Sequence, residues 1–264
     1  MKKIISVMQK TTRWCCENPA WTLLFIVLLS LGIKFILWRV DPMISRDASF
    51  YLHNIRDWQE SGIMPQSFIP PMFYCLVRAV MTLGLGPEHA SVWLNLVSGS
   101  LLTVIIYGIA MESTCSRKIS LFAAALMAFH SSINALSHEV QRDVPYLFFA
   151  GAAVWLAIAG FRRKKWYLLA AAGAFTALSL ATRYETLEII LIVFCTLTVF
   201  AAVRCFSWKQ SIGYGLSFTC AFFSVLILFF IVSGYNDVCA HYRYYFGEKL
   251  QAVGLLPADE TGGK

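Results

Sequence analysis

Long apolar runs, separated by short basic clusters, constrain this chain more than any other feature of its sequence. A helix rising 1.5 Å per residue needs about 20 apolar residues to cross about 30 Å of hydrocarbon. The 264 residues are 58% hydrophobic and only 14% charged, whereas soluble domains are about 45–50% apolar and about 25% charged. The sequence therefore predicts an all-α, polytopic membrane bundle rather than a soluble domain with one anchor.

The apolar runs predict about seven transmembrane helices in a single module that covers residues 1–264. The first span, 20–38, is followed by an outer loop at 41–89, the remaining spans lie within 90–233, and residues 234–264 form an outer tail. After the first span, we place the spans at 90–111, 117–133, 145–161, 166–182, 187–203 and 211–233.

The distribution of charge predicts the orientation of the bundle. Basic residues of the loops fall on one face and most acidic residues on the other, and cytoplasmic loops of membrane proteins are enriched in Lys and Arg. We therefore expect an inner-membrane or plasma-membrane protein with a cytoplasmic N-terminus and an outer C-terminus. The run 162–165 is then an orientation signal. The net charge of +7 needs no nucleic-acid partner, because no soluble basic segment is interleaved with aromatic residues.

The loop after the first span contains two amphipathic helical patterns. The first begins near Asp47, and its apolar stripe is predicted to lie in the membrane interface. The second is predicted to start at Pro70 and Pro71 and to end at Gly84. The stripes consist of Ala48, Tyr51, Leu52, Ile55 and Trp58 in the first helix and Phe73, Leu76, Val77, Val80 and Met81 in the second.

Titratable residues of the outer face form three clusters that could converge on one site. They are Arg46 with Asp47, the segment His138, Glu139, Arg142 and Asp143, and Arg183 with Glu185. Each cluster lies at the end of a span, where the cost of a charge is far lower than at mid-membrane. The placement of all three clusters on one face is therefore stronger evidence for a shared site than the presence of any single charge.

The residues alone leave two interpretations open for each of the main candidates. Asp47 is either the N-cap of a helix starting at Ala48 or a fixed general base. Asp143 is either a favourable charge at a helix N-terminus or part of an acidic site. Arg183 either pairs with Glu185 or Glu188, or holds a lipid phosphate.

Two further polar positions have simpler readings. Lys34, in the outer part of the first span, is expected to extend its ammonium towards the headgroups. Asn134 is expected to be a polar packing group.

The order of these motifs resembles the GT-C superfamily of membrane glycosyltransferases, in its protein-mannosyltransferase and aminoarabinose-transferase-like branch. The resemblance rests on Arg46-Asp47-Ala48-Ser49-Phe50-Tyr51 after the first span, on the segment 137–149, and on the segment 173–185, and it covers roughly residues 20–200. Many members have a second acidic residue directly after the first, where this chain has Ala48, and they usually have more than seven spans.

The resemblance implies transfer of a sugar from a polyprenyl-phosphate carrier to a lipid, protein or glycan acceptor on the outer face, usually with inversion. It implies that Asp47 acts at the acceptor and that Asp143, or alternatively Glu139, supports the site. It fixes no cofactor and leaves a divalent cation open. Together with the residue patterns, it predicts a substrate-binding set of Arg46, Tyr51, His138, Arg142, Arg183, Glu185 and Arg243.

Two rival functions remain at this point. A multi-spanning transporter or flippase would carry ionisable residues near mid-membrane and spans broken by Gly or Pro. A truncated, non-catalytic membrane subunit would need none of the outer carboxylates. The gathering of titratable residues at one face favours the enzyme.

Overall fold

A computed structural model describes residues 14–40, 46–64 and 70–232, and within these ranges every regular element is helical. The elements are α2 (Pro19–Val40), α3 (Arg46–Ser61), α4 (Met72–Met81), α5 (Pro87–Thr114), α6 (Arg117–Ala128), α7 (Ser131–Ser137), α8 (Asp143–Arg163), α9 (Trp166–Leu180), η1 (Tyr184–Thr186), α10 (Leu187–Ala202) and α11 (Trp208–Val232). The all-α polytopic class is thereby confirmed.

All seven predicted spans coincide with helices, but not all of these helices have the same length. Five helices of the described chain are long and apolar enough to cross a membrane, and a sixth crossing is possible if a bent pair counts as one span. The helix α9 is apolar but has only 15 residues, or about 22 Å of rise. The predicted third span is the bent pair.

A break in the backbone divides that third span into α6 and α7. The two helices meet at an angle of 51°, where the expectation was one straight helix. Phe129 and His130 leave the helical conformation, and the His130 side chain accepts a hydrogen bond from the backbone N–H of Ile133 at 3.4 Å. A side chain that caps a new helix in this way satisfies a donor that the break would otherwise orphan.

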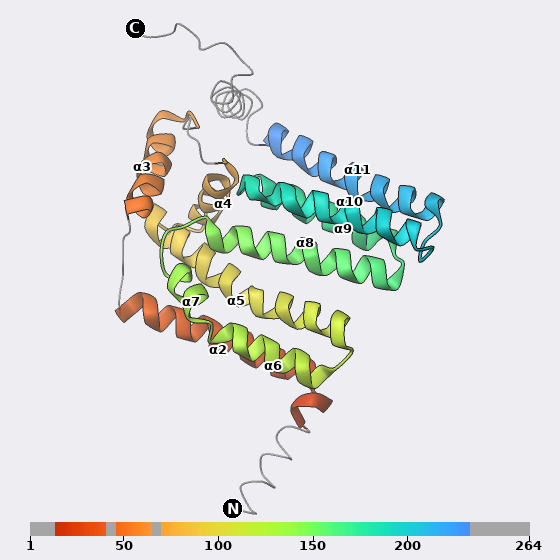
Figure 1. Cartoon of the computed structure of the whole chain (residues 1–264). Helices are drawn as coiled ribbons and strands as arrows, with labels where there is room; N and C mark the ends of the chain where they lie inside the picture. The colour runs from red at the N-terminus through yellow and green to blue at the C-terminus, as the bar shows by residue number, and fades with distance from the viewer. Residues whose placement is uncertain (1–13, 41–45, 65–69, 233–264) are drawn as a thin grey trace, which may run out of the picture.

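The long helices lie side by side, and α3, α4 and α7 lie at one end of them (Figure 1). α5 packs on α2, α6 and α8, and α9 packs on α8 and α11. α3, α4, α7 and η1 lie at the end where α8 begins, and we call it the polar end. The connections α5–α6, α8–α9 and α10–α11 lie at the opposite end, here called the basic end.

Small residues allow the long helices to approach closely, as in many membrane bundles. A Cβ added at Gly173 of α9 would lie 2.1 Å from the carbonyl oxygen of Phe218 in α11. One added at Gly108 of α5 would lie 2.1 Å from the indole ring of Trp155 in α8. These two contacts fix the spacing of the α9–α11 and α5–α8 pairs.

The apolar stripes of α3 and α4 face protein rather than lipid. All five predicted residues of the α3 stripe are buried, and they share a core with Phe73, Val77 and the first turns of α5. Tyr74, outside the predicted stripe, is also fully buried and its hydroxyl accepts a 2.9 Å hydrogen bond from Asn54. The two helices therefore form a packed platform over the polar end of the bundle.

The expectation for Lys34 is wrong. Its side chain is fully buried, and its ammonium donates to Ser30 Oγ at 2.7 Å and to Asn134 Oδ1 at 2.8 Å. Gly99 of α5 makes room for it, because a Cβ there would lie 3.0 Å from Lys34 Cε. The cation is thus held inside by two neutral acceptors and by the space that Gly99 leaves. Asn134 is confirmed as a polar packing group.

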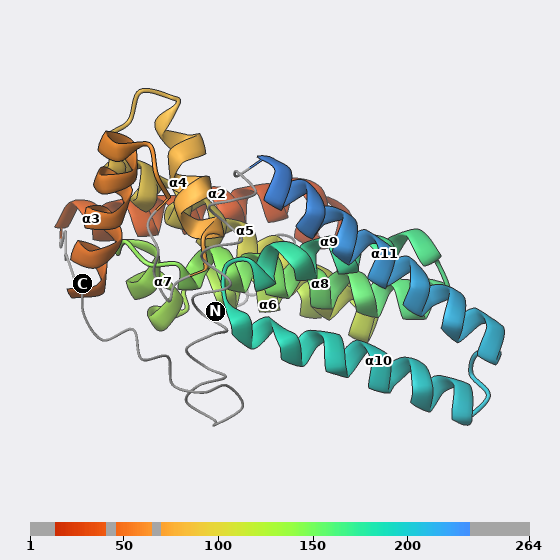
Figure 2. The same cartoon turned by 90° about the horizontal axis from the view of Figure 1, so that it is seen from above.

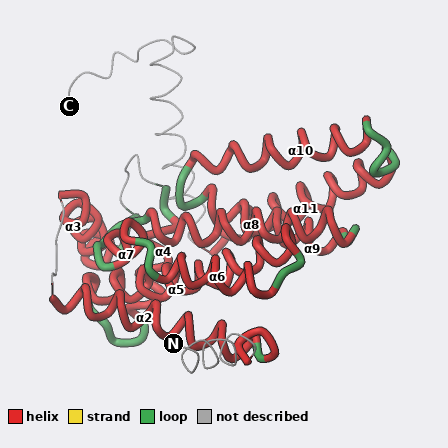
Figure 3. The backbone as a smooth tube through the Cα atoms, turned by 60° about the horizontal axis from the view of Figure 1, so that its bottom comes forward, coloured by secondary structure: helices red, strands yellow, loops and turns green. Residues whose placement is uncertain are grey.

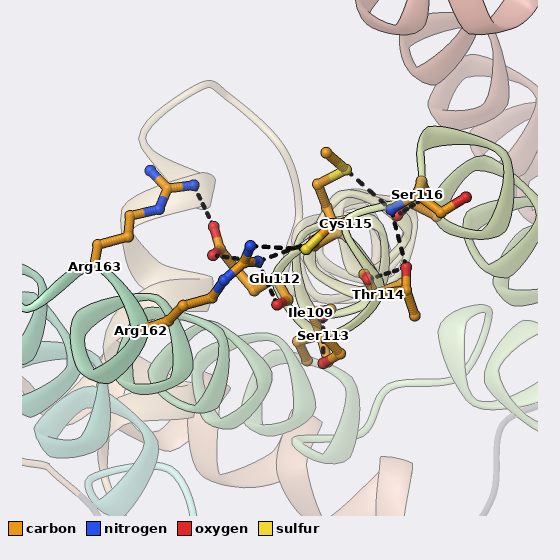
Figure 4. Close-up of polar contacts among 11 residues, drawn as sticks. Ile109, Glu112, Ser113, Thr114, Cys115, Ser116, Arg162 and Arg163 are labelled. Atoms are coloured by element: carbon orange, nitrogen blue, oxygen red, sulfur yellow. Dashed lines mark hydrogen bonds and ion pairs between the residues drawn. The ribbon is translucent and has the colours of Figure 1, made fainter. Parts of the chain in front are cut away.

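A buried carboxylate organises part of the basic end. The guanidinium groups of Arg162 and Arg163 converge on Glu112, whose side chain is only 4% exposed (Figure 4). Arg162 also donates to Cys115 Sγ at 2.8 Å. The arginines that the sequence marks as an orientation signal therefore also join α8 to α5.

Candidate active site at the polar end

The candidate site lies where the start of α8 meets the turn between α9 and η1, within electrostatic reach of Tyr51 in α3. The apolar segments of the long helices stop at this end, which leaves polar residues at the surface of the bundle. Met72 of α4 donates its backbone N–H to the carbonyl of Ala181 at 3.0 Å. This bond fastens the platform of α3 and α4 to the segment that carries Arg183.

Arg183 is the central cation of the site. Its guanidinium pairs with the carboxylate of Asp143 through one nitrogen and with Glu185 at 2.6 Å through the other. The same group lies 5.4 Å from the centre of the Tyr146 ring. The hydrogen bond that Arg183 donates to Glu185 and the charge of Asp143 raise the pKa of Arg183 above its ordinary value, so the group stays cationic at every working pH.

These contacts bear on the open interpretations of Asp143 and Arg183. Asp143 is the first residue of α8, where a carboxylate is favoured by the helix dipole, and it is also an ion-pair partner. Arg183 pairs with Glu185, which was one of its two alternatives, while its Nε has no partner among the described residues. Its pairing with Asp143, 40 positions earlier in the chain, was not predicted.

The connection from α7 to α8 is held by α5. The side-chain amide of Asn95 donates to the backbone carbonyls of Glu139 at 2.6 Å and Gln141 at 2.8 Å. Gln141 in turn donates to the Glu139 carboxylate. His138 is buried, and its Nδ1 bonds to the carbonyl of Asn134 at 3.0 Å, so this imidazole closes the end of α7.

Two guanidinium groups at this end retain unused donors. Arg142 Nη1 and Arg183 Nε are both buried and have no hydrogen-bond partner among the described residues. A buried donor without a partner costs about 1–3 kcal/mol. An anion of suitable shape would recover that energy, because guanidinium N–H groups match phosphate and carboxylate oxygens.

Tyr51 connects α3 to this cluster. Burial raises the pKa of its phenol to about 12, with the charge of Arg142 opposing the shift and those of Asp143 and Asp47 adding to it. The charges of three predicted site residues therefore influence one hydroxyl. That phenol remains protonated, and so able to donate, throughout the physiological range.

Asp47 occupies a different position from the one expected for an N-cap. The helix begins at Arg46, so Asp47 lies in the first turn, where it is exposed and makes no ion pair with any described residue. Arg46 starts the same helix, but its side chain lies outside what the structure describes, as does the whole of Arg243. Predicted residues from all three clusters nevertheless converge at one end of the bundle.

Asn95 and Tyr146 are the contributors to this end that sequence reasoning missed. Asn95 is a fully buried amide inside an apolar span. A single amide side chain in such a span was the sequence feature that could have identified it. Tyr146 resembled an ordinary aromatic residue at a span end. In the described part of the chain, no group of three or more His, Cys, Asp or Glu side chains could hold a metal ion.

Comparison with known families agrees with this architecture. Residues 69–232 match the family model described as dolichyl-phosphate-mannose-protein mannosyltransferase. The matched region runs from the start of the α4 segment through α11 and includes Asp143 and Arg183. No curated protein was found to match the chain. The match covers more than half of the sequence, and the chain therefore belongs to the dolichyl-phosphate-mannose-protein mannosyltransferase family of membrane glycosyltransferases.

Proposed function

We propose that this chain transfers a sugar from a polyprenyl-phosphate carrier to an acceptor hydroxyl on the outer face of the membrane, with inversion at the sugar. The observation that carries the proposal is the convergence of Arg142 and Arg183, each with an unused buried donor, beside the carboxylates Asp143 and Glu185. Family membership supports a lipid-linked donor. The polarity of the site supports a charged headgroup rather than a neutral lipid.

The proposed reaction needs a base for the acceptor and a cation for the leaving group. The acceptor oxygen bonds to the anomeric carbon of the sugar as the bond from that carbon to the phosphate oxygen breaks. The electron pair of the broken bond stays on the polyprenyl phosphate, which leaves. The acceptor's proton passes to a carboxylate of the protein. Stabilisation of the departing phosphate by fixed charges is the largest expected contribution to the rate.

Asp47 is assigned as that base, because its carboxylate is exposed and has no cationic partner among the described residues. Asp143 is assigned a positioning role, since its carboxylate is already held by Arg183. Glu139 is the second choice of base, and its contact with Gln141 would have to open first. Arg183 and Arg142 are assigned to the phosphate.

The decisive test replaces Asp47 by Asn, with Asp57→Asn as the matched control. Asp57 lies on the same helix and is also exposed, and it pairs with His53 at 3.2 Å, away from the cluster. Cells lacking the chain are complemented with wild type or either variant, and their surface glycans and polyprenyl-phosphate sugars are measured by mass spectrometry. We expect one glycan to disappear and its lipid-linked donor to accumulate in the null and Asp47→Asn cells only. Wild-type glycans in the Asp47→Asn cells would remove Asp47 from the mechanism.

One observation favours a transporter as the second candidate. Lys34 is an ionisable group buried inside a span, and it contacts Asn134 directly after the break between α6 and α7. Transporters combine such features at their substrate sites. Reconstituted vesicles separate the two functions, because a flippase moves labelled polyprenyl-phosphate sugar across the bilayer without an acceptor, whereas a transferase consumes it only when the acceptor is present.

A further inference from the structure

A groove between α8 and α10 extends to the basic end of the bundle, which the proposed reaction does not use. Its volume is about 680 Å³, within the range of about 300–1,000 Å³ that is common for ligand pockets. The helix α10 stands at the edge of the bundle, set apart from α8 (Figures 2 and 3). Most of the wall is apolar, with Val154, Ile158 and Phe161 on one side and Ile192, Val193 and Phe200 on the other, and Arg162 and Lys164 line its basic end.

The end of this groove nearest the α8–α9 connection is aromatic, and its rim there is cationic. Phe206 is 5% exposed and packs edge-on against Phe200 at 5.3 Å. Lys164 lies at the rim with its Nζ 5.8 Å from the centre of the Phe206 ring. The groove thus changes from aliphatic to positively charged over its length, which is the pattern of a lipid chain followed by a headgroup.

No carboxylate in the described part of the chain pairs with Lys164 at this rim. Glu112 engages both Arg162 and Arg163, whereas Lys164 is exposed and makes no ion pair with any described residue. The connections 162–165 and 203–210 contain no Asp or Glu at all. An anionic partner therefore complements this rim, and a zwitterionic one does so only weakly.

We propose that the groove binds an anionic phospholipid, with one acyl chain between α8 and α10 and the phosphate at Lys164. Basic pockets between transmembrane helices bind anionic headgroups for the same electrostatic reason. The polyprenyl-phosphate donor is not the expected occupant. Its phosphate is assigned to Arg183, and the 21 residues of α8, about 30 Å of helix, separate the two ends.

The test is native mass spectrometry of the purified chain, titrated with phosphatidylglycerol, with phosphatidylcholine of the same acyl chains, and with polyprenyl phosphate. We expect phosphatidylglycerol to bind about five-fold more tightly than phosphatidylcholine, since one Lys near the surface contributes about that factor. Lys164→Gln should remove the preference, whereas Lys165→Gln, whose side chain does not line the groove, should retain it.

A second pair of variants tests the groove itself. Thr196→Trp fills it, and Leu191→Trp on the same helix places the same ring outside it. Only Thr196→Trp should weaken binding of both phospholipids, with elution volume and melting temperature unchanged for every variant that is compared. Equal affinity for the two phospholipids would overturn the proposal, as would a preference for polyprenyl phosphate that Thr196→Trp abolishes, or a dimer of the chain that Thr196→Trp dissociates.

Discussion

The close approach of α9 and α11 at Gly173 makes a sharp prediction about stability. A Cβ at this position would lie 2.1 Å from the carbonyl oxygen of Phe218 and 2.9 Å from its carbonyl carbon. Both are backbone atoms, so no side-chain rotation can relieve the overlap. Restoring a contact of about 3.5 Å requires the helices to separate by about 1.4 Å, along the most extensive helix pair of the described chain.

The expected cost of Gly173→Ala follows from two opposing effects. Overpacking a well-filled interface costs about 1–3 kcal/mol, and the rigid backbone contact places this case near the upper end. Replacing Gly by Ala inside a helix returns up to about 1 kcal/mol in helix propensity. We therefore expect a net loss of about 1–2 kcal/mol, which lowers the melting temperature by about 2–8 °C for a chain of this size.

Gly213→Ala is the matched control, because it lies in α11 and its added Cβ would meet no atom within 4 Å. It should leave the melting temperature unchanged or raise it slightly. Both variants are followed by tryptophan fluorescence on heating in the same detergent, with a check that the protein stays monodisperse. If the two variants melt together, α9 and α11 do not approach as closely as described, and the argument from Gly173 fails.

Three further changes test other contacts. Arg183→Gln should weaken donor binding by at least ten-fold and leave Asp143 without its cation; an unchanged donor affinity in a binding assay would contradict its assignment to the phosphate. Glu112→Gln should lower the free energy of unfolding by about 1–2 kcal/mol, since it removes charged hydrogen bonds to two arginines. The control Glu60→Gln changes an exposed residue and should leave the free energy of unfolding unchanged. Equal melting temperatures for the two variants would refute this prediction. The pKa of Tyr51 is raised from 10 to about 12 in the folded protein, so the stability linked to its protonation is present below pH 10 and is lost as the pH rises to 12. Wild type should therefore lose about 2–3 kcal/mol of unfolding free energy relative to Tyr51→Phe over that interval. Parallel melting curves for the two proteins would count against this.

Span positions and the grouping of charges could be predicted because both are local properties of the sequence. Hydropathy summed over about 20 residues reports whether a segment can cross the bilayer, whatever its neighbours are. The helical periodicity of apolar residues and the turn-forming residues likewise located α3, α4 and the turn at Gly84, whose φ is +85°. The gathering of predicted site residues at one end follows from the same information, since each lies at the end of a span.

The chemistry within that end could not be predicted in the same way. The partners of Arg183 depend on how α8 and α9 pack, which brings together residues 40 positions apart. The tie from Asn95 to Glu139 spans 44 positions. Local patterns identify which residues carry charge, but they carry no information on which charges are paired and which N–H donors are left unused.

The sequence by itself determined that this protein is a helical membrane bundle whose candidate site residues lie near the ends of its spans, because a bilayer selects segments by their own composition. Only the tertiary structure decided that Lys34 is buried against Asn134, 100 positions away, that Arg183 bridges two carboxylates, and that α10 leaves a groove beside α8. These features depend on the crossing of helices, and the physical reason is that helix packing is set by side-chain shape at contacts distant in the chain.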